Sequence, residues 1–243
     1  MTDAGPLAIG GTVVRPVAHG ILHRNDRLPH MYWQNFLSVD STTELDAGAL
    51  IAEADRLFAD LEIRHVLVTD AETAKRLRPG FLAGGYREAV LVTMALRRPP
   101  DREPPAADLT EVPASQLRPA VEAYVRGGPR DEAAQRELCL LKEELERGGV
   151  RFLAARVDGE VAGWCELRRH DAAGQVEDVV VLEPFRGKGL ARALVCGAVE
   201  RLRTDGSDPI FVVADDNDTV KHLYSRLGFD DVRRTWSFWW PGP

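Results

Sequence analysis

The chain has 243 residues, of which 44% are apolar and 28% charged, and its formal net charge is −7. These values are ordinary for a globular protein with a sizeable core, and the acidic balance argues against a general affinity for nucleic acid, which needs a basic face. No apolar run approaches the length of a membrane-spanning helix, so no membrane is expected as a partner.

The cysteines and the first residues predict the compartment. Three cysteines are present, an odd number, and no C-x-x-C pair occurs. A disulfide framework or a zinc cluster is therefore not expected, and no metal site is predicted. The opening residues, MTDAGPLAIGG, lack the basic region and apolar run of a signal peptide. Together these features predict a cytoplasmic protein.

The first half of the chain alternates between helix and strand patterns, after about 30 residues of weak periodicity. Asp70 is a plausible N-cap for a helix, which Pro79 and Gly80 should interrupt. The predicted elements are a strand or an approach to one over residues 31–39, a helix over 47–61, a strand over 64–69, a helix over 70–77 and a strand over 88–96.

Residues 97–107 (RRPPDREPPAA) contain four prolines in eleven residues, with charges between them. Such a segment cannot form a regular helix and is predicted to be a stiff, extended linker. We therefore expect a smaller α/β domain over residues 1–100, a Pro-rich linker over 101–107 and a second domain over 108–243.

The second half is predicted to contain a hairpin followed by a third strand. Asp158-Gly159 is a two-residue hairpin signal, and HDAAGQ (residues 170–175) reads as a polar loop. The predicted elements are a strand over 109–112, a helix over 114–125, a helix from Asp131 to 147, strands over 150–157, 161–168 and from 176, a helix from 190, a strand over 210–214, a helix that ends at Gly228, and a last strand over 235–240.

The most informative stretch is VEDVVVLEPFRGKGLARAL, residues 176–194. A β-branched strand leads through a glycine-containing loop into an amphipathic helix. Backbone N–H groups at such a helix N-terminus bind anions, and the charges of Arg186 and Lys188 suit a diphosphate. A nucleotide-hydrolase loop continues from its second glycine with Lys and then Ser or Thr, whereas here Leu190 follows Gly189. Arg192 occupies the third glycine position of the dinucleotide fingerprint. Both of those commoner loops are therefore excluded.

Together with the order of elements before it, residues 186–191 resemble the Gln/Arg-x-x-Gly-x-Gly/Ala loop of the GNAT superfamily, the acyl-CoA-dependent N-acyltransferases. Two further segments carry the resemblance, which covers about residues 107–240. The strand VEDVVVLEPF is similar to the family's fourth strand with its β-bulge. The run NDTVKHLYSRLGF, residues 217–229, resembles the family's second cofactor motif.

The resemblance implies an α/β protein whose C-terminal half has the GNAT fold, a central mixed, mostly antiparallel sheet flanked by helices. It implies acetyl-CoA as the co-substrate, with residues 179–181 against the pantetheine arm and residues 186–191 around the diphosphate. It also implies that Asn217 contacts the arm and that Tyr224 protonates the leaving thiolate. The implied cofactor-binding residues are Val179, Val180, Val181, Arg186, Gly187, Lys188, Gly189, Leu190, Ala191, Asn217 and Tyr224.

A catalytic base is also expected, because acetylation of an amine by a thioester needs the neutral amine. Glu177 and Asp178 directly precede the implied pantetheine-binding residues, and strand alternation predicts that their side chains point to opposite faces. A Glu nine residues before the loop Arg matches the base of some family members. Glu177 is therefore the first candidate and Asp178 the second.

The first half parallels residues 190–240 in its order of helix, strand, helix, glycine-aromatic turn and strand. Gly84-Gly85-Tyr86 stands where Leu227-Gly228-Phe229 stands later, but DSTTELD replaces the cofactor loop before the first helix. This half is therefore predicted to be a degenerate GNAT-like domain, with an unrelated α/β cap as the alternative. One cofactor site per chain is expected.

The C-terminal run TWSFWW departs from the family, because only fourteen residues follow Phe229, enough for one strand or a much-shortened hairpin. Alternation places Trp236, Phe238 and Trp240 on one face. A strand that covers the core is predicted, with an aromatic acceptor pocket or a dimer face as the alternative. The N-terminal half could then complete the sheet.

These observations predict an N-acetyltransferase that transfers an acetyl group from acetyl-CoA to a primary amine of a small molecule or peptide by direct attack. Two alternatives stay open. One is a non-catalytic acyl-CoA-binding or regulatory module, and the other is an acyltransferase with another acyl chain or a hydroxyl acceptor. A homodimer is compatible with the sequence.

Overall fold

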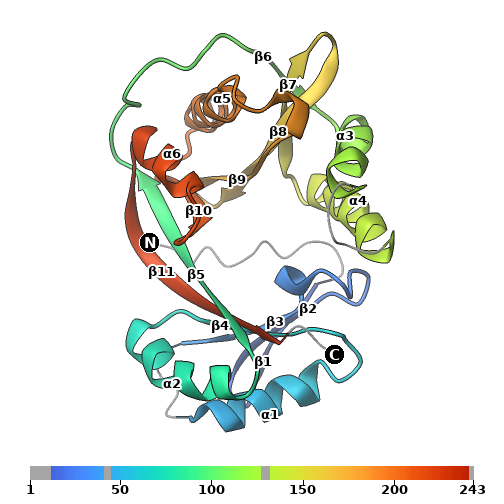
Figure 1. Ribbon diagram of the computed structural model, residues 1–243, viewed down its shortest axis with the longest axis vertical. Helices are drawn as coiled ribbons and strands as arrows, with labels where there is room; N and C mark the ends of the chain where they lie inside the picture. Colours follow the sequence, from blue (N-terminus) through green and yellow to red (C-terminus); the bar gives the residue numbers. More distant parts are fainter. Residues whose placement is uncertain (1–11, 41–44, 127–131, 241–243) are drawn as a thin grey trace. The chain divides into compact units, whose positions relative to one another are not determined.

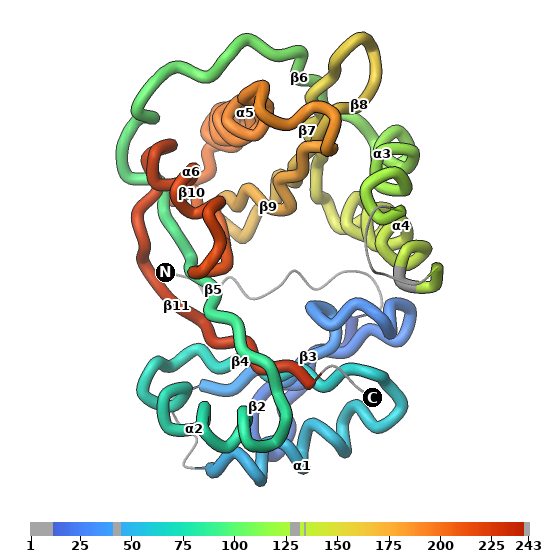
Figure 2. The backbone as a smooth tube through the Cα atoms, viewed as in Figure 1, coloured from blue at the N-terminus to red at the C-terminus, as the bar shows by residue number. Residues whose placement is uncertain are grey.

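The computed structural model describes residues 12–40, 45–126 and 132–240 (Figures 1 and 2). Their contacts divide the chain into two compact units. Of the described residues, unit 1 contains 93–214 and 218–232, and unit 2 contains 12–92, 215–217 and 233–240. The Pro-rich segment belongs to unit 1, and the division into sequential domains stays a prediction.

Unit 2 combines two helices with a sheet of five strands and the first part of a sixth, β5. Its strand order is β1-β2-β3-β4-β11, in which β3 and β4 are parallel and the other pairs antiparallel. Its elements are β1 (Val13–Val17), β2 (Gly20–Arg24), a 3-10 turn η1 (Tyr32–Gln34), β3 (Phe36–Val39), α1 (Ala47–Leu57), β4 (Arg64–Val68), α2 (Ala71–Ala83), the first part of β5 (Arg87–Leu96) and the last part of β11 (Phe229–Trp240).

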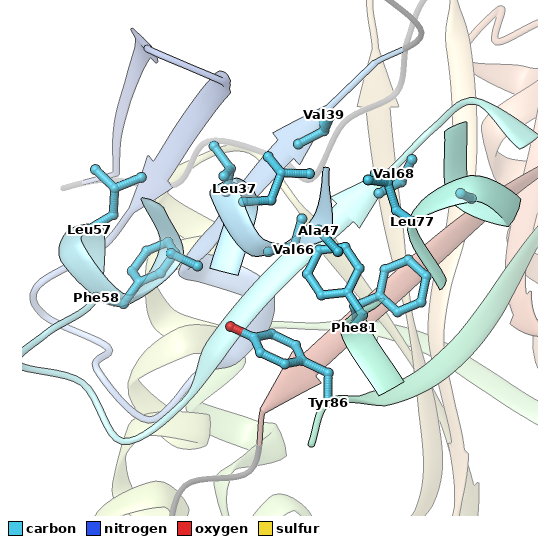
Figure 3. Close-up of a cluster of buried hydrophobic side chains, with 14 of the residues drawn as sticks. Leu37, Val39, Ala47, Leu57, Phe58, Val66, Val68, Leu77, Phe81 and Tyr86 are labelled. Atoms are coloured by element: carbon cyan, nitrogen blue, oxygen red, sulfur yellow. The ribbon is translucent and has the colours of Figure 1, made fainter. Parts of the chain in front are cut away.

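The core of unit 2 lies between its sheet and helices α1 and α2 (Figure 3). Phe81 of α2 is fully buried and stacks on Phe238 of β11, with ring centroids 4.5 Å apart. Trp236 and Trp240 pack against the same cluster. The predicted core-covering strand is therefore confirmed, and the idea that this aromatic face forms an acceptor pocket is wrong.

Several boundaries in unit 2 differ from the prediction. A β1–β2 hairpin occupies part of the segment with weak periodicity, and α1 ends at Leu57 rather than residue 61. Helix α2 begins after the Asp70 cap, as expected, but continues through Pro79 to Ala83. Leu77 and Phe81, both buried in the core, hold the helix on each side of the proline, so tertiary packing outweighs the lost hydrogen bond.

Unit 1 is a six-stranded sheet in the order β5-β10-β9-β8-β7-β6. Strands β6 to β9 are antiparallel, and β9 and β10 are parallel. Helices α3 and α4 cover one face and α5 the other (Figure 1). The elements not yet given are β6 (Asp108–Val112), α3 (Ala114–Arg126), α4 (Glu132–Arg147), β7 (Arg151–Val157), β8 (Glu160–His170), β9 (Ala173–Val181), the 3-10 turn η2 (Glu183–Phe185), α5 (Leu190–Thr204), β10 (Ile210–Asp215) and α6 (Val220–Arg226).

The sheet of each unit contains a strand from the other half of the sequence. In unit 2, Trp236 to Trp240 of the C-terminal strand β11 pair with β4, and in unit 1, β5 lies next to β10. The short C-terminus therefore forms one strand, and the N-terminal half supplies a strand to the sheet of unit 1, as predicted.

The hairpin before β9 is tighter than expected. Strand β8 extends to His170 and β9 begins at Ala173, so Asp171 and Ala172 alone form the turn, and the predicted polar loop is wrong. Asp171 adopts a left-handed φ of 52°, which an Asp tolerates in such a turn. Helix α4 is described from Glu132, so the predicted N-cap Asp131 lies outside the described residues.

Candidate functional site

Strands β9 and β10 separate at the end of β9. Their parallel pairing joins Gly174–Val176 to Ile210–Val212, although β9 continues to Val181. The Leu182 N–H donates to the Ala162 carbonyl of β8, so the amide of the preceding residue, Val181, faces the opposite edge of β9. The described part of β9 therefore offers backbone groups that β10 does not pair, at residues 177–181.

The loop after β9 leads into helix α5, whose N-terminus has no side-chain cap. Gly187 and Gly189 have φ angles of 78° and 80°, values that glycine adopts without strain. Gly189 is the N-cap of α5 and supplies no side-chain hydrogen bond, so the first N–H groups of α5 are left for a ligand. Arg186 donates from Nε to the Val181 carbonyl at 3.1 Å and ties the loop to the open edge of β9.

A pocket of about 590 Å³ surrounds this loop. Val181 and all six predicted loop residues, 186–191, line it, whereas Val179, Val180, Asn217 and Tyr224 do not. The other lining residues are Arg102, Glu103, Pro105, Phe185, Arg192, Leu223 and Arg226. A loop with bare amides in a basic pocket fits an organic diphosphate.

A contact with a neighbouring segment also favours glycine at position 189. A Cβ atom there would lie 2.8 Å from Cγ of Pro105, whereas a Cβ on Gly187 would meet open space. A side chain at 189 would thus first strike the Pro-rich segment, rather than project toward a bound diphosphate.

The corresponding helix of unit 2 has a different N-terminus. The Asp46 carboxylate caps α1 and accepts a hydrogen bond from the Ala49 N–H at 2.8 Å. This carboxylate occupies the position that an anion would take and repels negative charge. An anion at the N-terminus of α1 would therefore meet this carboxylate, whereas the N-terminus of α5 has no side-chain cap.

A β-bulge brings both candidate bases to the same face of the sheet. On β8, Trp164 and Glu166 face Val180 and Glu177 of β9, so one extra residue lies on β9 between these pairs. Asp178, inside the bulge, has a left-handed φ of 48°. The predicted alternation fails here, because this conformation turns the Asp178 side chain toward α4, on the side of Glu166.

Asp178 is held in this position by two donors. Its Oδ2 accepts from Lys142 Nζ of α4 at 2.5 Å and from Trp164 Nε1 of β8 at 2.8 Å. Burial alone would raise the pKa of the Asp178 carboxyl, but the Lys142 ammonium and the Trp164 N–H outweigh it and hold that pKa below its usual range. Lys142 also pairs with the buried Glu166, to which Arg168 donates from Nε at 2.8 Å.

Glu177 has a different environment. It accepts a hydrogen bond from the neutral amide of Gln175, whose carbonyl oxygen lies 2.7 Å from His170 Nε2. Burial raises the pKa of the Glu177 carboxyl, against the opposing charge of Arg168. Among the described residues, no ammonium or guanidinium lies within ion-pair distance of Glu177.

Asn217 and Tyr224, the two predicted residues of the second cofactor motif, lie in the turn before α6 and on α6 itself. Tyr224 is 5% exposed and packs edge-on against Phe229, with centroids 6.2 Å apart. Burial and, after it, the nearby Glu177 carboxylate raise the pKa of Tyr224, so the phenol keeps its proton at neutral pH. Asn217 is exposed in the turn after β10, where its N–H donates to Asp215.

Sequence reasoning missed Lys142, Trp164 and Gln175. Lys142 had a detectable signal, because it lies four residues after Leu138 and three before Leu145, within the apolar stripe of α4. A cation on a buried face needs a carboxylate partner. Nothing in the local pattern of Trp164 or Gln175 indicates which side chain each contacts.

The described residues show two further features relevant to function. They contain no group of three or more His, Cys, Asp or Glu side chains that could hold a metal ion. No helix within the described ranges is long and apolar enough to cross a membrane.

Comparisons with known proteins agree with this geometry. Residues 116–229 match the model of the acetyltransferase (GNAT) family. Over 81 residues the chain is 31% identical to an N-alpha-acetyltransferase MAK3 of Arabidopsis thaliana; this match covers 32% of the chain and 43% of that relative's length.

Two solved structures share the fold over nearly the whole chain. A conserved protein of unknown function from Staphylococcus epidermidis superposes with a TM-score of 0.72 at 14% identity, covering 98% of this chain and 96% of that one. A tandem GNAT protein from the clavulanic acid biosynthesis pathway gives 0.59 at 18% identity, covering 97% and 85%. With its open β9 edge and uncapped α5, the C-terminal half of this chain is similar to the acetyltransferase (GNAT) family, whose model it matches over residues 116–229.

Proposed function

We propose that the protein is an N-acetyltransferase that transfers the acetyl group of acetyl-CoA to a primary amine. One observation supports this most directly: the uncapped N-terminus of α5 lies in a basic pocket beside the unpaired edge of β9. A diphosphate bound at residues 186–191 would direct the pantetheine arm along Val179 to Val181.

We assign the base to Glu177. The cluster contains three carboxylates and two cations. Lys142 pairs with Glu166 and Asp178, and Arg168 pairs with Glu166. Glu177 is left with a neutral hydrogen-bond partner and a raised pKa, which suits a group that accepts and releases a proton. In this proposal Asp178 shapes the bulge and does not accept the proton.

The proposed reaction is a direct transfer. The amine nitrogen attacks the thioester carbonyl carbon, the C–N bond forms, and the C–S bond breaks with its electron pair on sulfur. Glu177 accepts the amine proton, directly or through a water, and the Tyr224 hydroxyl donates a proton to the departing thiolate. The Val181 N–H, which faces the open edge of β9, would stabilise the carbonyl oxygen as it gains negative charge.

The acceptor is best sought first among peptide N-termini, because the Arabidopsis relative carries the name N-alpha-acetyltransferase. Small-molecule amines form the second panel. The test is CoA release from acetyl-CoA with the full chain, measured against both panels and a matched set of alcohols.

Variants separate the assigned roles. Glu177→Gln and Tyr224→Phe should each lower kcat by about 10²–10⁴-fold and leave acetyl-CoA affinity nearly unchanged, as loss of a general base or acid does. Asp178→Asn is the matched comparison for Glu177→Gln, and its pH–rate profile should keep the ascending limb that Glu177→Gln loses. Acetyl-CoA binding without turnover of any acceptor would favour a non-catalytic acyl-CoA-binding module.

A further inference from the structure

Part of the Pro-rich segment, residues 101–105, forms one wall of the pocket around the loop. Arg192 of α5 pairs with Asp101 at 2.7 Å and donates to the Arg102 carbonyl at 3.2 Å. The Asp101 N–H donates to the Arg226 carbonyl at the end of α6, at 2.8 Å. The segment is thus fastened to both helices that border the pocket, and Pro105 lies against Gly189.

The residues that line this pocket carry a large excess of positive charge. Five cationic side chains line it, against the single carboxylate of Glu103, and they are Arg102, Arg186, Lys188, Arg192 and Arg226. Arg186 and Lys188 belong to the loop itself, and Arg186 is already bonded to β9.

Three of these guanidinium groups have unused donors. The Arg192 side chain is 4% exposed, and its Nη2 is buried without a hydrogen-bond partner. Arg102 and Arg226 are exposed, and within the described ranges no carboxylate lies at ion-pair distance from either. Arg102 and Arg226 therefore offer free guanidinium donors to a second anionic group at this pocket, and the buried Arg192 fixes the segment that carries Arg102.

We propose that Arg102 and Arg226 bind the 3′-phosphate of coenzyme A, with Arg192 holding the Pro-rich segment in place. This inference rests on the proposed function, because it takes the diphosphate to lie at residues 186–191. A phosphate monoester carries close to two negative charges and presents oxygens that match the fork of a guanidinium. Two arginines, from a linker and from α6, outweigh the repulsion of Glu103.

The experiment compares acetyl-CoA with its 3′-dephospho form on the full chain by isothermal titration calorimetry. The wild type should bind acetyl-CoA at least tenfold more tightly. Arg226→Gln and Arg102→Gln should each weaken acetyl-CoA binding by about tenfold or more, as the loss of one charge-assisted hydrogen bond predicts. Neither should change the affinity for the dephospho form.

The control is Arg169→Gln, which removes an exposed arginine on β8 outside the pocket and should leave both affinities at the wild-type values. Asp101→Asn, which releases the anchor of the segment, should reduce the preference for the 3′-phosphate while the protein still binds the dephospho form. Equal wild-type affinities for the two ligands, or equal losses for both in the arginine variants, would overturn the inference and leave the diphosphate site intact. No binding of either ligand would instead refute the proposed function.

Discussion

Lys142→Met tests the buried charge cluster beneath the β9 bulge. Lys142 is 4% exposed on its side chain, and its ammonium contacts Glu166, which is 1% exposed, and Asp178. Removing the Lys142 ammonium leaves Arg168 as the cation for a cluster of three carboxylates, those of Glu166, Glu177 and Asp178. Removing one partner of a buried ion pair typically costs about 3–5 kcal/mol, a large share of the roughly 5–15 kcal/mol by which a protein is stable. We expect a loss of that size at pH 8.

The loss should depend on pH. In the wild type the pKa of Asp178 is lowered, so this group stabilises the fold above its unfolded pKa, and that stability is lost only as the pH falls through the folded value. Without the ammonium, only the Trp164 N–H and the charge of Arg168 still oppose burial, so the pKa of the Asp178 carboxyl should rise. The variant can then relieve its penalty by taking up a proton, and the gap to the wild type should narrow as the pH falls from 8 toward 5.

The assay is urea unfolding followed by circular dichroism at several pH values. Arg136→Met is the matched control, because Arg136 lies on the same helix, is 73% exposed and pairs with Glu132, itself 91% exposed, so its loss should cost less than about 1 kcal/mol. The double variant Lys142→Met/Asp178→Asn should recover part of the loss. A Lys142→Met loss no larger than that of Arg136→Met, or a gap independent of pH, would refute the reasoning.

Two further predictions concern other sites. Burial lowers the pKa of His65 to about 4. The free energy of unfolding should therefore fall by up to about 3 kcal/mol as the pH drops from above 6.5 through 4, because the unfolded state binds the proton. His65→Gln should remove this part of the pH dependence in denaturant titrations. Gly189→Ala should weaken acetyl-CoA binding more than Gly187→Ala in calorimetry, since both strain a positive φ but only the first displaces Pro105; equal effects would contradict the role of Pro105.

The sequence predicted those parts of the fold whose signals are local. Helix α5 and its loop follow from a 3.6-residue apolar period behind two glycines, and the separate strands of the first half follow from β-branched runs. The Asp70 cap was read from its residue type and was confirmed by its hydrogen bond to the Thr73 N–H at 2.8 Å.

The parts that were missed depend on residues far apart in the chain. Asp178 adopts a left-handed φ that its residue type does not require, and Lys142, 36 positions away, holds its carboxylate at the bulge. Alternation along β9 therefore gave the wrong face for a candidate base. Pro79 remains inside α2 because Phe81 packs on Phe238, a residue near the other end of the chain.

The two halves differ in one helix cap, and this difference bears on where the proposed coenzyme A site lies. In each half a parallel pair of strands is joined through a helix, β3 to β4 through α1 and β9 to β10 through α5. Asp46 caps α1 with a carboxylate, which satisfies a backbone donor and places a negative charge where a diphosphate would lie. Gly189 caps α5 without a side chain and leaves those donors to the ligand. Stabilising the helix by its own sequence and binding an anion there are thus competing uses of the same N–H groups. For this reason α1 serves the core of unit 2, and the cofactor site is proposed at α5 alone.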